Sequence, residues 1–169
     1  MRVFDSIAAL KEAIGEHLGH SDWHTVSQER VDAFADATGD HQWIHVDPAA
    51  AARGPFGTTI AHGYLMLSMI PMLAAQISRV EGVRMGINYG LNRVRFPAPL
   101  PTGSPLRAGV RLLSVDDVAG GVQVVNEVTL EREGGDKPCC VAETVARYYT
   151  AAPQDPRDHE PRDTEPRRS

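Results

Sequence analysis

Residues 63–77 read Gly-Tyr-Leu-Met-Leu-Ser-Met-Ile-Pro-Met-Leu-Ala-Ala-Gln-Ile and contain no carboxylate. Large apolar side chains occur on almost every side of the helix that this stretch predicts, and helices of that kind are buried on most sides. Pro71 removes one backbone hydrogen bond, so we expect a bend at that point. The rest of the domain is therefore expected to be built around this helix.

After this helix the spacing of apolar residues changes to two, which is typical of strands with one buried face. The alternating segments cover residues 83–96, 106–112, 122–130 and 141–149. In the first segment the alternation slips by one residue beside Gly90 and Asn92, which predicts a β-bulge. One apolar helix followed by long antiparallel strands predicts an α+β protein with a single hot-dog fold, an antiparallel sheet wrapped around a central apolar helix.

Shorter elements are expected before the central helix. Ser6 can cap a helix over residues 7–18 that lies across the outside of the domain. A short strand over 23–26 then leads to Ser27, a good N-cap for a helix that ends near Thr38. Asp47 and Pro48 suit the N-cap and first position of one further helical turn. Residues 53–59 contain three Gly or Pro residues around Phe56, and we expect an ordered loop there.

Between two of these helical patterns lies Thr-Gly-Asp-His-Gln-Trp-Ile-His, residues 38–45. Gly39 allows a left-handed turn that ends the preceding helix. Asp40 and His45 are then expected to project from a short non-helical segment into one space. Gly63 begins the central helix, and helix starts present free N–H groups and a positive dipole end. A carboxylate, an imidazole and a helix start together suit water activation and carbonyl polarisation.

This stretch resembles the signature of the MaoC-like dehydratases and the (R)-specific enoyl-CoA hydratases (hydratase 2), which reads Gly-Asp-x-Asn-Pro-aliphatic-His. Gln42 stands for the Asn and Trp43 for the Pro, whereas four residues match: Gly39, Asp40, Ile44 and His45. Residues 61–63, Ala-His-Gly before an apolar helix, resemble a second block of the family. The resemblance runs from about residue 21 to residue 149, which is most of the chain.

The resemblance implies hydration of a trans-2-enoyl thioester to an (R)-3-hydroxyacyl thioester, or the reverse dehydration. Asp40 and His45 would hold one water, and the Gly63 N–H would hold the thioester oxygen. The substrate, an acyl-CoA or an acyl-carrier-protein thioester, is expected to contact five further residues: Gln42, Trp43, Phe56, His62 and Ser68. No metal or organic cofactor is expected, because the thioester itself acidifies the α position. Hot-dog subunits join edge to edge, so a homodimer is expected.

Other roles for these residues remain open. Asp40 can cap a turn, His45 can be a hydrogen-bonded core residue, and Ser68 can bond back to the preceding turn. A metal site would use four residues: Asp40, His41, His45 and His62. His41 and His45 are four residues apart, but zinc-binding pairs at that spacing normally lie on a regular helix, and Gly39 and Trp43 argue against one here. A hot-dog thioesterase would hydrolyse the thioester but normally carries an acid on the central helix. A non-catalytic acyl-binding subunit would keep the fold without the catalytic pair.

Composition limits the class of protein. The 169 residues include 42% hydrophobic and 23% charged residues, as in an ordinary globular protein. A formal net charge of −5 argues against nucleic-acid binding, and no apolar stretch approaches the roughly 20 residues of a membrane span. The two cysteines, Cys139 and Cys140, are expected to be buried and free in a reducing, cytoplasmic compartment. Residues 1–150 are expected to form the domain, and 151–169 a disordered tail rich in Pro and charge.

Overall fold

The computed structural model describes residues 1–150, so the predicted tail, 151–169, lies outside the described residues. Five helices lie among these residues: α1 (Ile7–Glu12), α2 (Gln28–Thr38), α3 (Trp43–Val46), α4 (Pro48–Ala51) and α5 (Gly63–Ala74). The strands are β1 (Arg2–Phe4), β2 (His17–His20), β3 (His24–Thr25), β4 (Ser78–Val80), β5 (Met85–Arg95), β6 (Pro105–Val118), β7 (Gly121–Arg132) and β8 (Cys140–Tyr149).

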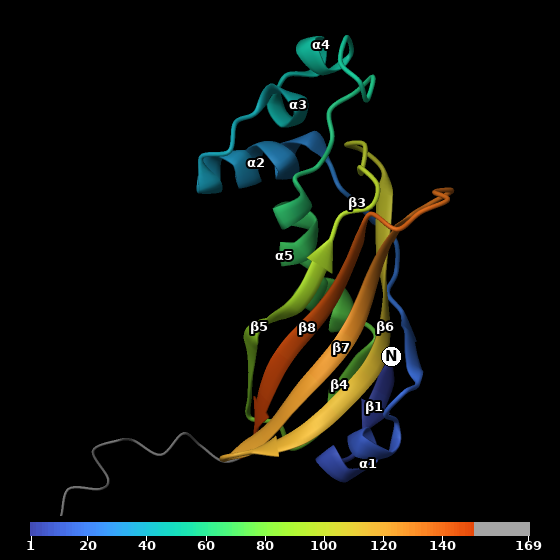
Figure 1. Ribbon diagram of the computed structural model, residues 1–169, viewed down its shortest axis with the longest axis vertical. Helices are drawn as coiled ribbons and strands as arrows, with labels where there is room; N and C mark the ends of the chain where they lie inside the picture. The colour runs from blue at the N-terminus through green and yellow to red at the C-terminus, as the bar shows by residue number, and fades with distance from the viewer. Residues whose placement is uncertain (151–169) are drawn as a thin grey trace, which may run out of the picture.

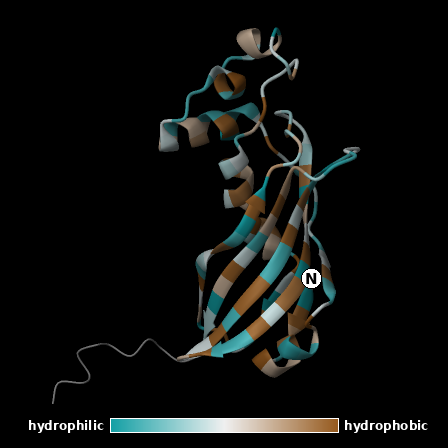
Figure 2. Cartoon of the chain, in the orientation of Figure 1, coloured by the Kyte–Doolittle hydropathy of each residue, from teal (hydrophilic) through white to brown (hydrophobic). Residues whose placement is uncertain are grey.

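The main sheet has six strands in the order β2-β6-β7-β8-β5, with β3 also paired to β6, and all its pairs are antiparallel. Strands β6, β7 and β8 follow one another in the chain and form a curved layer with α5 behind it (Figure 1). Apolar and polar residues alternate along these strands (Figure 2), as expected for a sheet with one face on the core. A small parallel pair, β1 and β4, completes the structure.

The central helix α5 lies against this sheet and contacts β6 and β8. Its buried side chains are Leu65, Met66, Met69, Ile70 and Leu73. They belong to the same core cluster as the inward-facing leucines of the sheet, among them Leu106, Leu112 and Leu130. The prediction of an antiparallel sheet wrapped around one apolar helix is therefore confirmed.

The four long strands are confirmed, and so is the bulge in β5. The register of β5 against β8 shifts between Asn88 and Gly90 and again between Leu91 and Arg93. The predicted helix over 7–18 is wrong in its second half. It ends at Glu12, and Leu18 lies in β2 because the backbone of residues 17–20 pairs with β6. Ile14, expected on the apolar stripe, is 45% exposed.

Helices α2, α3 and α4 lie beyond one end of the sheet (Figure 1), and we call residues 27–62 the overhang. Ser27 caps α2, since its hydroxyl oxygen accepts a hydrogen bond from the Arg30 N–H. Asp47 caps α4 in the same way through the Ala50 N–H, with Pro48 in the first turn. Both predicted caps are confirmed. The overhang is thus a set of short capped helices placed above the start of α5.

Two further observations concern the chain as a whole. Cys139 and Cys140 are buried and free, as predicted, and burial raises the pKa of the Cys140 thiol to about 11. Within residues 1–150, none of the helices combines the length and the apolar character that a membrane crossing requires.

Candidate active site

Asp40 is placed by the end of helix α2. Gly39 has a φ of 79°, in the left-handed region that favours glycine, and its N–H donates to the Ala35 carbonyl. The chain turns there, as the sequence predicts, and Asp40 follows directly with an exposed side chain. The Asp40 carboxylate is therefore exposed to solvent and also lies close to His45 and His62.

His45 lies in the single-turn helix α3, which corrects the expectation of a non-helical segment. Its side chain is only 7% exposed. The Nδ1 atom lies 2.7 Å from the Ile60 carbonyl oxygen, and because a carbonyl only accepts, Nδ1 carries the proton. The Nε2 atom is therefore left with its lone pair. Burial lowers the pKa of His45 below 6.5, which favours the neutral imidazole.

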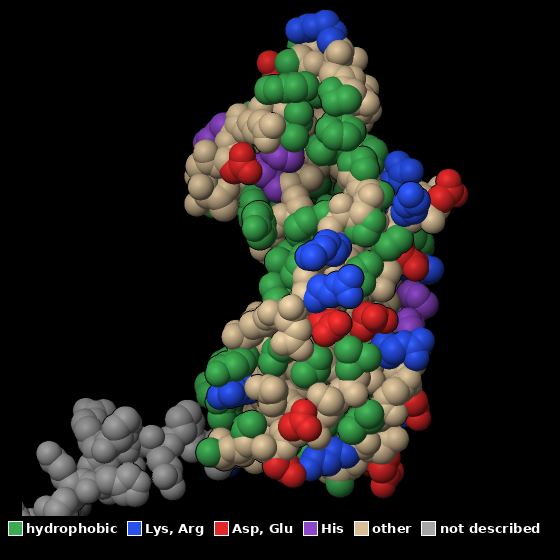
Figure 3. Space-filling model, in the orientation of Figure 1, with side chains coloured by type: hydrophobic (Ala, Val, Ile, Leu, Met, Phe, Trp, Pro, Cys, Tyr) green, Lys and Arg blue, Asp and Glu red, His purple; other side chains and the backbone are tan. Residues whose placement is uncertain are grey.

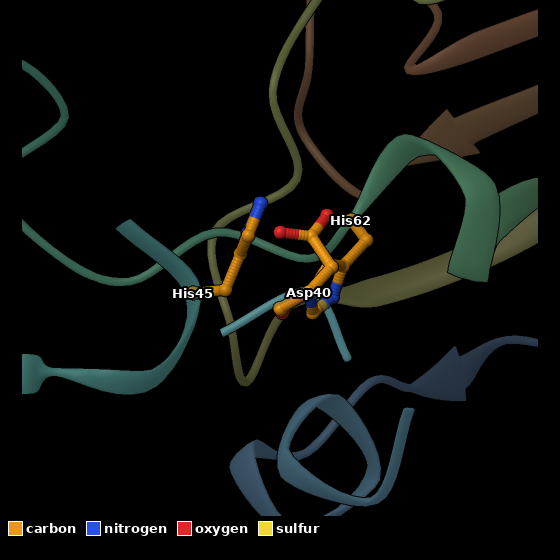
Figure 4. Close-up of side chains that lie close together, drawn as sticks. All are labelled: Asp40, His45 and His62. Atoms are coloured by element: carbon orange, nitrogen blue, oxygen red, sulfur yellow. The ribbon is translucent and has the colours of Figure 1, made fainter. Parts of the chain in front are cut away.

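His62 joins the two. Its ring stacks on that of His45, with centroids 3.8 Å apart. Its Nε2 donates to the Asp40 backbone carbonyl at 2.9 Å, so the turn that carries Asp40 is tied to the start of α5. Side-chain ligand atoms of Asp40, His45 and His62 all lie within 4.8 Å of one another. Figure 4 shows these three side chains converging from separate segments, with the Asp40 carboxylate beside the His45 ring.

A second set of contacts holds the backbone of His45. The Gln28 amide donates to the His45 carbonyl and to Asp32, each at 2.8 Å, and its oxygen accepts from the Thr59 hydroxyl at 2.7 Å. Gln28 thus connects α2, α3 and the loop before α5. Sequence reasoning missed this residue and the Ile60 carbonyl. No signal in the sequence identifies a backbone carbonyl acceptor such as that of Ile60. Gln28 has a usable signal, because it is an amide in the first turn of the helix that leads to the motif.

Gly63 is the first residue of α5, so its N–H has no acceptor within the helix. A Cβ at this position would lie 3.0 Å from the Phe96 ring. Glycine therefore leaves room for Phe96 to cover the helix start. Because His62 binds Asp40 and Gly63 follows it directly, the helix start, the acid and the imidazole lie in one place, as the sequence predicts.

The other predicted contact residues are more dispersed. Gln42 precedes α3 and is exposed, and Trp43 packs over Gly54 but remains 43% exposed. Phe56 is 44% exposed on the loop after α4. Ser68 lies one turn further along α5, where its hydroxyl donates to the Tyr64 carbonyl at 2.7 Å, the bond back to the preceding turn that the sequence leaves open.

The residues considered for a metal divide into two groups. His41 turns away from His45, and its Nε2 lies 2.9 Å from the Asp36 carboxylate, which raises the pKa of His41. His62 uses one ring nitrogen on Asp40, and its other nitrogen, Nδ1, is buried with no hydrogen-bond partner among residues 1–150. Because Nε2 carries the proton of His62, Nδ1 has a free lone pair, so the contact between His62 and Asp40 does not by itself exclude a metal ion at this cluster.

A cavity of about 740 Å³ runs along α5 from Leu67 to Ala74, and its other walls come mainly from β5, β6, β7 and β8. Figure 3 shows the molecule hollowed between the overhang and the sheet, with histidine atoms in the upper part of the hollow and hydrophobic side chains along it. A largely apolar cavity therefore lies along α5, the helix whose N-terminus forms part of the candidate site.

Comparisons with known proteins agree with this arrangement. Residues 9–133 match the family model described as "MaoC like domain". The 3-hydroxyacyl-thioester dehydratase Z of Mycobacterium tuberculosis is 58% identical over 149 residues, which are 88% of this chain and 99% of that protein. Nodulation protein N of Rhizobium leguminosarum bv. viciae is 44% identical over 157 residues, 90% of this chain and 94% of that protein. The solved (R)-hydratase from A. caviae, at 23% identity, has a TM-score of 0.65 over 79% of this chain and 94% of that chain.

Proposed function

Because this chain belongs to the MaoC-like dehydratase family, we propose that it adds water across the double bond of a trans-2-enoyl thioester. The product is an (R)-3-hydroxyacyl thioester, and the same site runs the reverse dehydration. One observation carries this proposal: Asp40 and His45 converge within 4.8 Å beside the N-terminus of α5. The reaction class agrees with the name of the relative that is 58% identical.

His45 is the group that moves the proton. Its Nδ1–H is held by Ile60, so only Nε2 faces the water, and the lowered pKa keeps Nε2 unprotonated near neutral pH. Nε2 removes one proton as the water oxygen forms a bond to C3. The π electrons of the double bond move to C2 and the thioester, giving an enolate. The imidazolium then returns the proton to C2, so the OH and the H come from one water and enter from the same face.

Asp40 and Gly63 supply the charge complementarity. The Asp40 carboxylate accepts the second O–H of the water, which orients it, and stabilises the imidazolium that forms beside it. The Gly63 N–H, at the positive end of α5, donates to the thioester oxygen as negative charge develops there. Further substrate contacts in this proposal are Gln42, Trp43 and Phe56, which are exposed on the overhang, and Ser68, which lines the cavity along α5.

Two alternatives on the same fold predict different chemistry. A hot-dog thioesterase normally carries an acid on the central helix, and α5 contains none. A binding subunit has no use for a neutral, oriented imidazole beside a carboxylate.

Purified protein incubated with crotonyl-CoA separates these possibilities. We expect loss of the enoyl absorbance without release of free thiol, and a 3-hydroxybutyryl product of R configuration. In D₂O, the deuterium at C2 should lie on the same face as the new hydroxyl. Thiol release without hydration would favour a thioesterase, absence of both signals a binding protein, and anti addition would overturn the relay through His45.

The protein is further proposed to work as a homodimer joined through β5. Within residues 1–150, β5 pairs only with β8, so its other edge is free. Four apolar side chains on it are 37–55% exposed: Met85, Ile87, Tyr89 and Leu91. A free, apolar edge of 11 residues invites pairing with another strand, and a second copy provides an identical one.

Light scattering on the pure full-length chain tests this assembly. We expect the mass of two chains, and Tyr89→Lys together with Leu91→Lys should give a monomer. Glu12→Lys, at an exposed position of α1 away from β5, changes the charge by the same amount and is the matched control, which should remain dimeric. A wild-type monomer at micromolar concentration would overturn the dimer.

The free and buried Cys139 and Cys140 support the reducing cytoplasm as the place of action.

A further inference from the structure

The cavity along α5 has a mixed lining: one polar region lies on the sheet, and Ser68, Ser78 and Asn88 contribute polar side chains elsewhere. Most of its lining is aliphatic, including Leu67, Ile70 and Val110. Asn126 of β7 and Thr144 of β8 also line it, and they are direct cross-strand partners. Their neighbours on the same face, Val124 and Val128, are each only 1% exposed. An amide and a hydroxyl thus lie side by side on the inner face of the sheet.

The amide of Asn126 lacks a partner. Its Oδ1 atom is buried and makes no hydrogen bond within residues 1–150. Thr144 does not supply one, because its hydroxyl donates to the Asn126 backbone carbonyl at 3.4 Å. Buried polar groups are almost always hydrogen-bonded, since leaving one unpaired destabilises the fold. A partner from outside the chain is therefore expected at this point of the cavity.

The position of Asn126 limits what that partner can be. Strands β8 and β5 lie between β7 and any chain that joins the free edge of β5, although Ile87 and Leu91 of β5 also line the cavity. The wall of the cavity on α5, in contrast, begins at Leu67, which is four residues after Gly63 and roughly 6 Å along the helix axis. A substrate chain that enters at Gly63 and follows α5 reaches the polar region several carbons beyond the thioester.

We propose that this cavity binds the acyl chain of the substrate and that Asn126 and Thr144 recognise a hydroxyl group on that chain. The proposal rests on the proposed hydratase function and names its substrate class: enoyl thioesters that carry a hydroxyl beyond the reacting carbons. A hydroxyl donates to the Asn126 carbonyl oxygen and accepts from an amide N–H, so it satisfies either orientation of the amide. Where the amide N–H donates to the substrate hydroxyl, the hydroxyl proton is free to be accepted by Thr144, whose own proton goes to the Asn126 carbonyl.

The test compares matched substrates on the full chain. One series is trans-2-enoyl-CoA from hexenoyl to decenoyl, and the other carries a terminal hydroxyl at each length. At the length that reaches Asn126, the wild-type kcat/KM should be at least tenfold higher for the hydroxylated chain. Asn126→Leu and Thr144→Val remove the polar atoms with little change in volume, and each should shift the preference at least tenfold towards the plain chain. Thr129→Val, the same change on the outer face of β7, is the control and should keep the wild-type ratio.

Measurements of melting temperature and of ligand affinity distinguish failure of the polar site from failure of the proposed hydratase function. Asn126→Leu should melt at the wild-type temperature or above, because it removes an unpaired buried group. Unchanged substrate ratios in that variant would mean that a bound water satisfies Asn126, and would overturn the proposal. If no enoyl thioester is hydrated, the proposed function fails. In that case calorimetric affinities of saturated acyl-CoA with and without the terminal hydroxyl still decide the polar site, and equal affinities would overturn it.

Discussion

The sheet and the overhang are held together by different kinds of contact. In the sheet, paired backbones and fully buried leucines such as Leu106, Leu112 and Leu130 form one continuous core. In the overhang, single polar bonds fix the critical positions: His62 to the Asp40 carbonyl, His45 to the Ile60 carbonyl, and Gln28 to the His45 carbonyl. Asp40 and Trp43 remain exposed there. Stability is therefore concentrated in the sheet and chemistry in the overhang.

Substitutions of the catalytic pair, Asp40 and His45, should give the largest loss of activity for the smallest loss of stability. Asp40→Asn and His45→Gln should each lower kcat by about 10²–10⁴, the range for losing a positioned acid or base. The melting temperature should change little for Asp40→Asn, since its side chain is exposed. Crotonyl-CoA turnover and thermal melting on one sample measure both quantities.

Leu130→Ala is the matched change in the sheet. Leu130 is fully buried, so the free energy of unfolding should fall by about 2–5 kcal/mol. Turnover per folded molecule should stay at the wild-type value. A stable but inactive Leu130→Ala protein would contradict the division between the two regions.

The next effect concerns Gly63 and separates two ways to lose activity. Gly63→Val should reduce kcat by roughly 10²–10³ by crowding the thioester at the helix start. The added side chain also meets the Phe96 ring, 3.0 Å from the first new carbon. The double variant Gly63→Val with Phe96→Ala removes that second contact. We expect activity to remain low in it, whereas recovery to the Phe96→Ala level would assign the loss to a displaced Phe96.

A smaller effect is expected at Gln28, which touches only other parts of the overhang. Gln28→Leu removes its bonds to the His45 carbonyl and to Thr59. The variant also loses the bond to Asp32, and at about 1 kcal/mol for each bond we expect a loss of stability of roughly 2–3 kcal/mol and a kcat roughly tenfold lower. KM should be unchanged, because Gln28 positions His45 and does not meet substrate. An altered KM with a normal kcat would argue against a positioning role.

The smallest effect is a shift in pH dependence. Burial lowers the pKa of His45 below 6.5, so the neutral form persists into mild acid. The acidic limb of kcat/KM should therefore have its midpoint below 6.5. The same shift acts on stability: the unfolded chain binds the proton more readily, so stability is lost as the pH falls from 6.5 to the folded-state pKa. His45→Gln should remove this slope from melting temperatures measured across that range, and a midpoint above 6.5 would contradict it.

The sequence predicts best those elements whose contacts are local. The caps at Ser27 and Asp47, the turn at Gly39 and the alternation of β6–β8 depend on neighbouring residues, and all are confirmed. The spacing of Leu18 from Leu10 fits a helix, so the sequence predicts a helix there, whereas Leu18 lies in β2. Its strand partner, β6, is far along the chain, and a helical pattern carries no information about it.

The sequence predicts the residues of the site better than it predicts the hydrogen bonds between them. The motif locates Asp40, His45, His62 and Gly63, but the bonds of His45 and His62 go to backbone carbonyls, which every residue has. Asn126 carried a usable signal, an amide in register with Val124 and Val128 on the apolar face of β7. Its meaning depends on the cavity opposite, which no single strand predicts.

The pairing of β1 with β4 has a consequence for the order of folding. Arg2 lies opposite Ser78, and β2 lies opposite a strand that begins at Pro105. During synthesis at roughly 5–20 residues per second, the first twenty residues wait seconds for these partners. Hairpins such as β6–β7 and β7–β8 form in roughly microseconds once their residues are available. Residues 1–20 leave the ribosome well before their partners and are therefore among the last to dock, so a protein fused ahead of β1 should interfere with the end of folding and spare its nucleus.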